Sequence, residues 1–195
     1  IIAPTPFETT KQKRDSIWSD DFSSDKHLAF YEWDLNNPKP ELEINEGQIA
    51  ITSNHKGITF LGLRPQTGDY MLSSKVILSS EMSGIGVYSN EKNVLALTAD
   101  KSNLLLFQLK GGEKEVLFSK KIEERESLYL KHEARDAQYF SFSWSENGTD
   151  WYPVMDDVDG TFIAQWGYSP RAGFIGEGKT GTLYNCSGLI IHYQY

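Results

Sequence analysis

Histidine and cysteine side chains are few in this sequence and lie far apart. The histidines, His27, His55, His132 and His192, form no recognisable metal-ligand motif, so each is expected to be a surface or strand residue. The single cysteine, Cys186, lies in an apolar segment, where a buried structural thiol is the usual state. Neither a Gly-x-Ser-x-Gly elbow nor a phosphate-binding loop occurs. Acyl transfer and phosphoryl transfer therefore have no support in these residues.

Carboxylates are abundant, and a pair of them could hydrolyse a glycoside. That reaction needs two carboxyl groups roughly 5 to 9.5 Å apart, one of them with a raised pKa. Many of the 27 acidic residues stand in polar runs such as Glu123-Glu124 and Asp156-Asp157, which are typical of solvated loops. A pairing across a sheet cannot be read from one sequence. We therefore predict no catalytic residue, and a carboxylate pair in a cleft stays open as an alternative.

Two acidic groups could instead bind calcium, which takes six to eight oxygen ligands. Asp20 and Asp21 stand near the first predicted strand, and a second acidic loop contains Asp156, Asp157 and Asp159. The spacing matches no EF-hand. We predict that no cofactor is required, with a structural calcium ion at Asp20 and Asp21 as a possibility.

Aromatic residues make up 13% of the chain, more than a minimal core needs. The flat face of an aromatic ring stacks against the C–H face of a sugar, and a neutral glycan needs few other contacts. The side chains spread through the predicted strands are Tyr31, Trp33, Phe60, Trp144, Trp151, Trp166 and Tyr168. Most of them are expected in the core, and some could form a sugar-binding platform.

The net charge of −8 makes nucleic acid and anionic lipid unsuitable partners, because both require clustered lysine and arginine. A neutral ligand fits this surface better. No segment approaches the roughly 20 apolar residues that a membrane helix needs. The single cysteine excludes an internal disulfide and says little about the compartment.

The elements that must position these residues are β-strands throughout. Alternating polar and apolar residues predict strands at 47–53, 69–79, 104–109, 115–120, 127–134, 139–145 and 181–195. The paired Gly111 and Gly112 predict a hairpin loop, and Asn147-Gly148 predicts a tight turn. The segment 120–126 has charged residues without an apolar face, so we interpret it as a loop. Turn signals about every ten residues are typical of a sandwich or barrel.

Residues 1–16 contain no apolar period and are predicted to be a flexible leader or linker, followed by one β-sandwich domain at 17–195. The chain starts with Ile1, which indicates processing or excision from a longer polypeptide. A chain of 195 residues can bury a core without a disulfide or metal.

Several short motifs occur in an order that resembles a known family. They are Asp20-Asp21-Phe22, Tyr31-Glu32-Trp33, Gly62-Leu63-Arg64-Pro65-Gln66, Gly84-Ile85-Gly86-Val87-Tyr88, Tyr139-Phe140-Ser141-Phe142-Ser143 continuing to Asn147-Gly148-Thr149-Asp150-Trp151, and Arg171-Ala172-Gly173-Phe174. Their order and spacing resemble the concanavalin A-like sandwich that follows the catalytic propeller in family-43 β-xylosidases and α-arabinofuranosidases. The resemblance covers nearly everything after the leader.

The resemblance implies an all-β, two-sheet antiparallel jelly-roll sandwich that packs on a propeller and helps to shape its sugar pocket. The catalytic acids of the family lie on the propeller, so none is carried over. Arg64 and Gln66 would lie on the concave face together with Tyr88 and Trp144, and Trp33 completes the predicted carbohydrate-binding set. The last strand departs from the family, because it reads Tyr184-Asn185-Cys186-Ser187-Gly188-Leu189 where an Asp-Phe-Asp run is usual. This departure weakens a calcium site that needs a carboxylate there.

The resemblance implies a non-catalytic carbohydrate-associated module of a polysaccharide-degrading enzyme, secreted, periplasmic or at the cell surface of a bacterium. Its partner would be a neutral plant-type glycan, xylan or arabinan, or a catalytic propeller domain. Two alternatives remain: a purely structural sandwich, and a glycosidase that uses a carboxylate pair in the concave cleft. Three or more aromatic rings exposed on one concave face would favour glycan binding.

Overall fold

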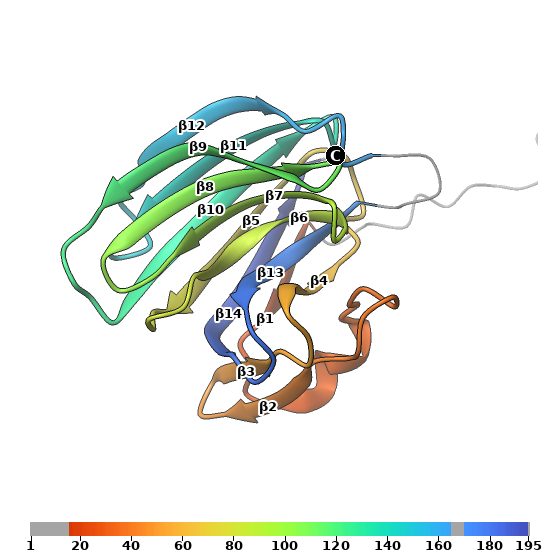
Figure 1. Cartoon of the computed structure of the whole chain (residues 1–195), viewed down its shortest axis with the longest axis vertical. Helices are drawn as coiled ribbons and strands as arrows, with labels where there is room; N and C mark the ends of the chain where they lie inside the picture. The colour runs from red at the N-terminus through yellow and green to blue at the C-terminus, as the bar shows by residue number, and fades with distance from the viewer. Residues whose placement is uncertain (1–15, 165–169, 195) are drawn as a thin grey trace, which may run out of the picture.

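A computed structural model describes residues 16–164 and 170–194 of the chain. Nearly all of the predicted leader, and the aromatic residues Trp166 and Tyr168, lie outside the described residues. Within them the chain forms two stacked antiparallel sheets (Figure 1). The predicted all-β sandwich is therefore confirmed.

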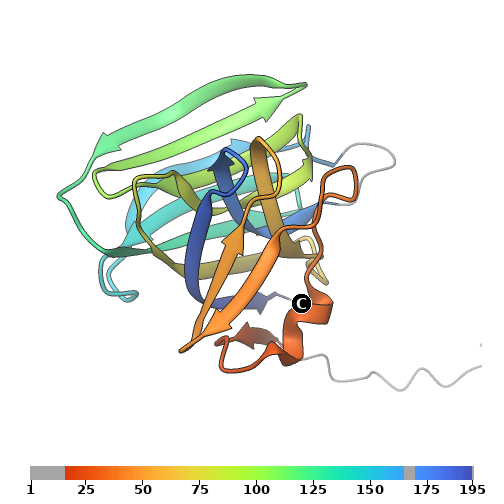
Figure 2. The same ribbon diagram turned by 60° about the horizontal axis from the view of Figure 1, so that its bottom comes forward.

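The larger sheet has eight strands in the order β12-β11-β10-β5-β14-β3-β2, with β1 paired to β14. Figure 2 shows β3 beside β14, so early and late parts of the described chain meet in one sheet. The strands of this sheet are β1 (Ile17–Asp20), β2 (Glu41–Asn45), β3 (Gln48–Thr52), β5 (Tyr70–Ile77), β10 (Ser127–Arg135), β11 (Tyr139–Ser145), β12 (Tyr152–Asp159) and β14 (Leu183–Tyr193).

The smaller sheet has six strands in the order β4-β13-β6-β7-β8-β9. Gly111 and Gly112 both have positive φ and close the hairpin between β8 and β9, as their pairing predicted. The strands of this sheet are β4 (Gly57–Leu63), β6 (Ser83–Asn90), β7 (Asn93–Ala99), β8 (Asn103–Lys110), β9 (Glu113–Lys121) and β13 (Arg171–Gly178).

The main core lies between the two sheets. In β5 and β10 buried and partly exposed residues alternate, which is the pattern of strands with one face in the core. In β7 all seven residues are buried. A strand buried on both faces needs cover on its outer side as well, and the eight buried residues of a second apolar cluster lie there.

A 3-10 helix, η1 (Asp25–Phe30), follows β1 and was not predicted from the sequence. The segment 120–126, interpreted as a loop, begins as the end of β9 and then runs irregularly into β10. Nowhere in the described segments does the chain form a helix with the length and hydrophobicity needed to span a bilayer.

Candidate functional site

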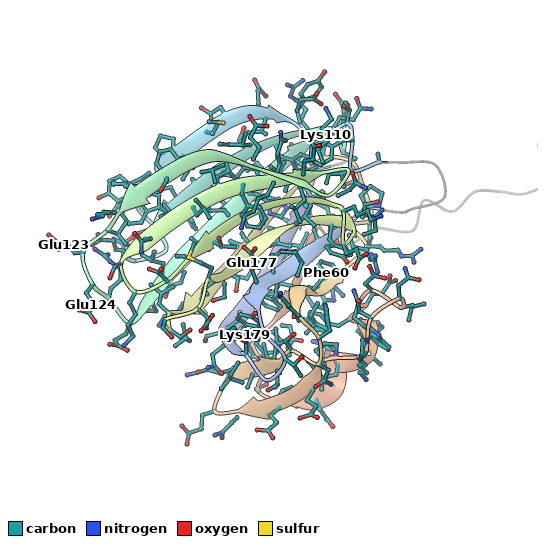
Figure 3. All side chains as sticks on the ribbon, viewed as in Figure 1. Phe60, Lys110, Glu123, Glu124, Glu177 and Lys179 are labelled. Carbon is teal, nitrogen blue, oxygen red and sulfur yellow. The ribbon has the colours of Figure 1, made fainter. Side chains whose placement is uncertain are left out.

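The outer face of the six-stranded sheet is concave. Lys114 of β9 and Glu177 of β13 form an ion pair across it, although β6, β7 and β8 lie between their strands. In a flat sheet, strands four places apart would be roughly 19 Å from each other. The two side chains therefore meet because the sheet bends toward them. We call this surface the concave face; Figure 3 labels Glu177 and Phe60, which belong to it.

A row of small residues permits the bend. Gly62, Gly173, Gly86 and Ala96 are successive register partners across β4, β13, β6 and β7. A Cβ atom on Gly173 would lie 2.4 Å from the Cα atom of Gly62, too close for any side chain. The row therefore lets neighbouring strands curve inward.

The aromatic rings on the concave face are buried beneath charged side chains. Phe60 is 3% exposed, and Tyr88 and Phe107 are 0% exposed. Phe60 and Tyr88 stack with their centroids 4.6 Å apart. The Arg171 guanidinium lies 5.2 Å from the Phe60 centroid, and Lys114 Nζ lies 4.5 Å from that of Phe107. This face consequently does not present the exposed rings that would favour glycan binding there.

The rim of the concave face is held by Arg171 at the start of β13. Its Nη1 donates to the carbonyl oxygen of Trp33 at 2.8 Å, and its Nη2 donates to that of Ser89 at 2.9 Å. Beside it, the Tyr88 hydroxyl donates to Asp34 Oδ2 at 2.6 Å. These bonds fix the base of the loop 33–40 to the six-stranded sheet.

Asp34 and Tyr88, which share a hydrogen bond at the rim, each keep one protonation state near neutral pH. Burial works against the charge of Asp34, but hydrogen bonds from Tyr88 and Asn36 and the charge of Arg171 outweigh it, so the pKa of Asp34 lies below its usual value. Burial, together with the bond to Asp34, raises the pKa of Tyr88. Asp34 is therefore a carboxylate near neutral pH and Tyr88 a neutral donor.

Arg64 and Gln66, predicted to bind sugar, lie at the end of β4 and just beyond it. Both are exposed. Arg64 Nε lies 2.9 Å from Glu32 Oε1, and the backbone of Glu32 pairs with Gly62 at the edge of the sheet. The structure thus brings Arg64 to the rim of the concave face, and its role in sugar binding stays a prediction.

Of the other predicted residues, Trp33 lies at the rim and Tyr88 lies buried on the concave face. The prediction that Trp144 lies on that face is wrong. Trp144 belongs to β11 of the other sheet, is 6% exposed in the main core, and contacts the ring of Tyr152 with centroids 5.0 Å apart. Its place follows from strand alternation, because it shares a face with the buried Phe140 and Phe142.

Asp20 and Asp21 do not point into one site. Asp20 is buried and accepts hydrogen bonds from the Phe22 amide at 3.0 Å and the Tyr31 hydroxyl at 3.3 Å. Asp21 is exposed, and its Oδ1 accepts from the amide of Ser23. In residues 16–164 and 170–194, no group of three or more His, Cys, Asp or Glu side chains is placed to hold a metal. Calcium binding stays a prediction.

An open polar cleft of about 450 Å³ adjoins the rim. It lies between Asp34, Asn36 and the turns at 90–93 and 111. Asn90 Oδ1 accepts from the Lys92 amide at 2.9 Å, so this asparagine stabilises its own turn. The described residues that line it are polar or glycine, without an aromatic ring among them.

Among the described residues, the thiol and carboxyl groups with a clearly shifted pKa are shifted in directions that do not favour covalent or acid catalysis. Burial raises the pKa of the Cys186 thiol, which suits a structural residue. In the described part of the chain, the carboxyl groups with a clearly shifted pKa are Asp21, Asp34 and Asp159, and all three are shifted downward. A glycosidase needs the opposite shift in its general acid.

A sequence model described as "Beta xylosidase C-terminal Concanavalin A-like domain" matches residues 19–178. The chain belongs to this family, and the predicted resemblance is confirmed. No curated protein matches the chain in sequence.

Solved structures share the fold at low sequence identity. The xylan β-1,4-xylosidase of Bacillus halodurans C-125 has a TM-score of 0.75 and 17% identity, covering 98% of this chain and 41% of that one. The GH43 BlXynB protein of Bacillus licheniformis has a TM-score of 0.73 and 18% identity, covering 96% and 41%. The chain thus spans about two fifths of the length of these two proteins.

A smaller protein also has this fold. The CBM2 module of the evolved Dit protein from Lactobacillus casei BL23 phage J-1 has a TM-score of 0.58 and 9% identity. The match covers 91% of this chain and 96% of that one. The sandwich therefore also occurs in a structure of about the same extent.

Proposed function

We propose that this chain is a non-catalytic accessory domain of a family-43 glycoside hydrolase. It packs against the catalytic domain and helps to complete a pocket for a neutral glycan of the xylan or arabinan type. We place it outside the cytoplasm of a bacterium, secreted, periplasmic or on the cell surface, where such polysaccharides are met. The family match and the length of the similar Bacillus enzymes support this role.

The observation that carries the proposal is the loop 33–40 at the rim of the concave face. Its base is fixed by Arg171 and by the bond from Tyr88 to Asp34, yet Leu35 beside that base is 83% exposed. Phe30, shortly before the loop, is 60% exposed. Large apolar side chains held out by an anchored segment suit contact with another protein surface.

A purely structural sandwich is the second candidate, and the buried rings of the concave face favour it. On that view the domain stabilises its catalytic partner without shaping the pocket. A glycosidase acting through a carboxylate pair is less consistent with the site, because the pKa of Asp34 is lowered rather than raised.

A chimeric enzyme tests the docking role. In this chimera the catalytic region of the Bacillus halodurans xylosidase is fused to the N-terminus of this chain. The hydrolysis of p-nitrophenyl β-xyloside by the chimera is then measured. Leu35→Asp should lower kcat/KM about tenfold, because charge at the contact displaces the loop from the pocket. Val116→Asp is the matched control, since Val116 is 54% exposed on the edge strand β9.

Two results would contradict the proposal. Equal activity of the Leu35→Asp and Val116→Asp chimeras would show that the loop does not face the catalytic domain. Hydrolysis by the chain alone, lost in Asp34→Asn, would establish the glycosidase alternative.

A further inference from the structure

A second cleft, of about 270 Å³, lies on the outer face of the eight-stranded sheet. It is formed where β10, β11 and β12 run side by side. In the register of β10 and β11, Lys131 lies opposite Ser143 and Glu133 lies opposite Ser141. One indole and five polar side chains line it: Lys131, Glu133, Ser141, Ser143, Trp151 and Asp156. We call it the Trp151 cleft.

The position of Trp151 is fixed by the turn that precedes it. Asn147 Oδ1 accepts from the amides of Thr149 and Asp150, both at 2.9 Å. Ser145 Oγ accepts from the amide of Gly148 at 2.9 Å. The turn is thus closed by its own side chains, and the half-buried indole is held at the edge of the cleft.

The polar groups of the cleft form a partly used hydrogen-bonding surface. Lys131 Nζ lies 4.8 Å from the Trp151 centroid and 2.8 Å from Glu133 Oε1. Ser141 Oγ accepts from the amide of Asp157 at 3.2 Å. Ser143 Oγ is buried and has no partner among the described residues. The Ser143 hydroxyl thus lies beneath the floor of the cleft, and the polar groups that a ligand can reach are those of Lys131, Glu133 and Asp156.

We propose that the Trp151 cleft binds one unit of a neutral glycan, with a sugar ring against the indole and its hydroxyls bonded to Lys131, Glu133 and Asp156. One lysine and two carboxylates give the cleft a formal charge that disfavours anions. Its volume lies just under the roughly 300–1,000 Å³ of typical ligand pockets, which suits one ring or two. The choice of xylan or arabinan as ligand class rests on the proposed function.

Binding to the isolated chain tests this site directly. Calorimetry with xylotriose and arabinotriose should detect at least one ligand, and tri-galacturonic acid should not bind. Trp151→Ala should weaken binding about tenfold or more, and Glu133→Gln severalfold. Trp18→Ala is the matched control, because Trp18 is also half-buried and lies on β1, outside the cleft.

An NMR titration gives a readout that does not depend on mutant stability. The five tryptophans give five indole N–H signals, and the signal lost in Trp151→Phe belongs to Trp151. That signal should shift on addition of the bound trisaccharide while the signal of Trp18 stays unchanged.

The inference fails if neither neutral trisaccharide binds, if Trp151→Ala binds as well as the parent chain, or if Trp18→Ala abolishes binding. Its failure is distinct from that of the docking role. Binding is measured without a catalytic domain, and the docking test depends on Leu35, which lies outside the Trp151 cleft.

Discussion

Two faces of the molecule carry the same small arrangement, a lysine over an aromatic ring with a glutamate bound to the lysine. On the concave face Lys114 lies 4.5 Å from the Phe107 centroid and pairs with Glu177. In the Trp151 cleft Lys131 lies 4.8 Å from the indole centroid and pairs with Glu133.

The two arrangements differ in how far the aromatic ring is buried by the rest of the chain. Phe107 is 0% exposed and its neighbours fill the concavity, whereas the indole of Trp151 is half-buried at the edge of an open cleft. Aromatic rings on a curved sheet therefore do not by themselves indicate a sugar platform. What decides is how much of the ring the chain itself leaves exposed.

The largest expected effect is the loss of stability in Phe107→Ala. Removing a fully buried ring leaves a cavity and should lower the free energy of unfolding by about 3–5 kcal/mol. The matched change Trp151→Ala, at a half-buried ring, should cost about 1 kcal/mol. Urea denaturation followed by circular dichroism measures both. Equal losses would show that the two rings are covered to the same degree and would break the comparison.

A smaller effect concerns His132, which lies between Lys131 and Glu133 on β10 and points into the core. It is 0% exposed, packs against Tyr70, Phe140 and Phe142, and neither ring nitrogen has a partner among the described residues. Burial lowers the pKa of this imidazole to about 3. The unfolded chain takes up a proton near pH 6.5, so stability is full above that pH and falls as the pH drops toward 3.

The stability lost at pH 5 through His132 should be about 2 kcal/mol relative to pH 7.5. Urea denaturation at the two pH values measures it, and His132→Phe should remove most of the difference. His192→Phe, at a half-buried imidazole on β14, should keep it. If His132→Phe retains the full pH dependence, protonation of another group causes it.

The smallest effect is expected from the ion pair over Phe107. Lys114 and Glu177 are 36% and 38% exposed, and pairs exposed to this degree contribute less than about 1 kcal/mol. Glu177→Gln should therefore lower the free energy of unfolding slightly, and 1 M salt should abolish the difference. A loss above 2 kcal/mol would mean that the pair, rather than the packing of the rings, closes the concave face.

The strands were predictable because one-sided burial leaves a period of two in the sequence. The predicted 139–145 matches β11, and 127–134 matches β10 to within one residue. The helix η1 gave no such signal, because none of its six residues is buried. A short exposed helix has no apolar stripe to reveal it.

The site was less predictable than the fold. Alternation already placed Trp144 in phase with Phe140 and Phe142, and this favoured the core over the concave face that the family resemblance suggested. Alternation could not show which sheet a strand joins, since that depends on pairing between distant segments. For the same reason the sequence did not indicate that Lys131, Ser143 and Trp151 lie close together in space.

The glycine row Gly62, Gly173 and Gly86 has a consequence for redesign. It allows the backbone of the six-stranded sheet to curve, and the rings of Phe60 and Phe107 fill part of the resulting concave face. A designer who wants a binding groove on this fold therefore does not need a new backbone. Replacing Phe60 and Phe107 by smaller side chains would open a groove on the existing backbone. The stability lost with the two rings would then have to be restored elsewhere in the sandwich.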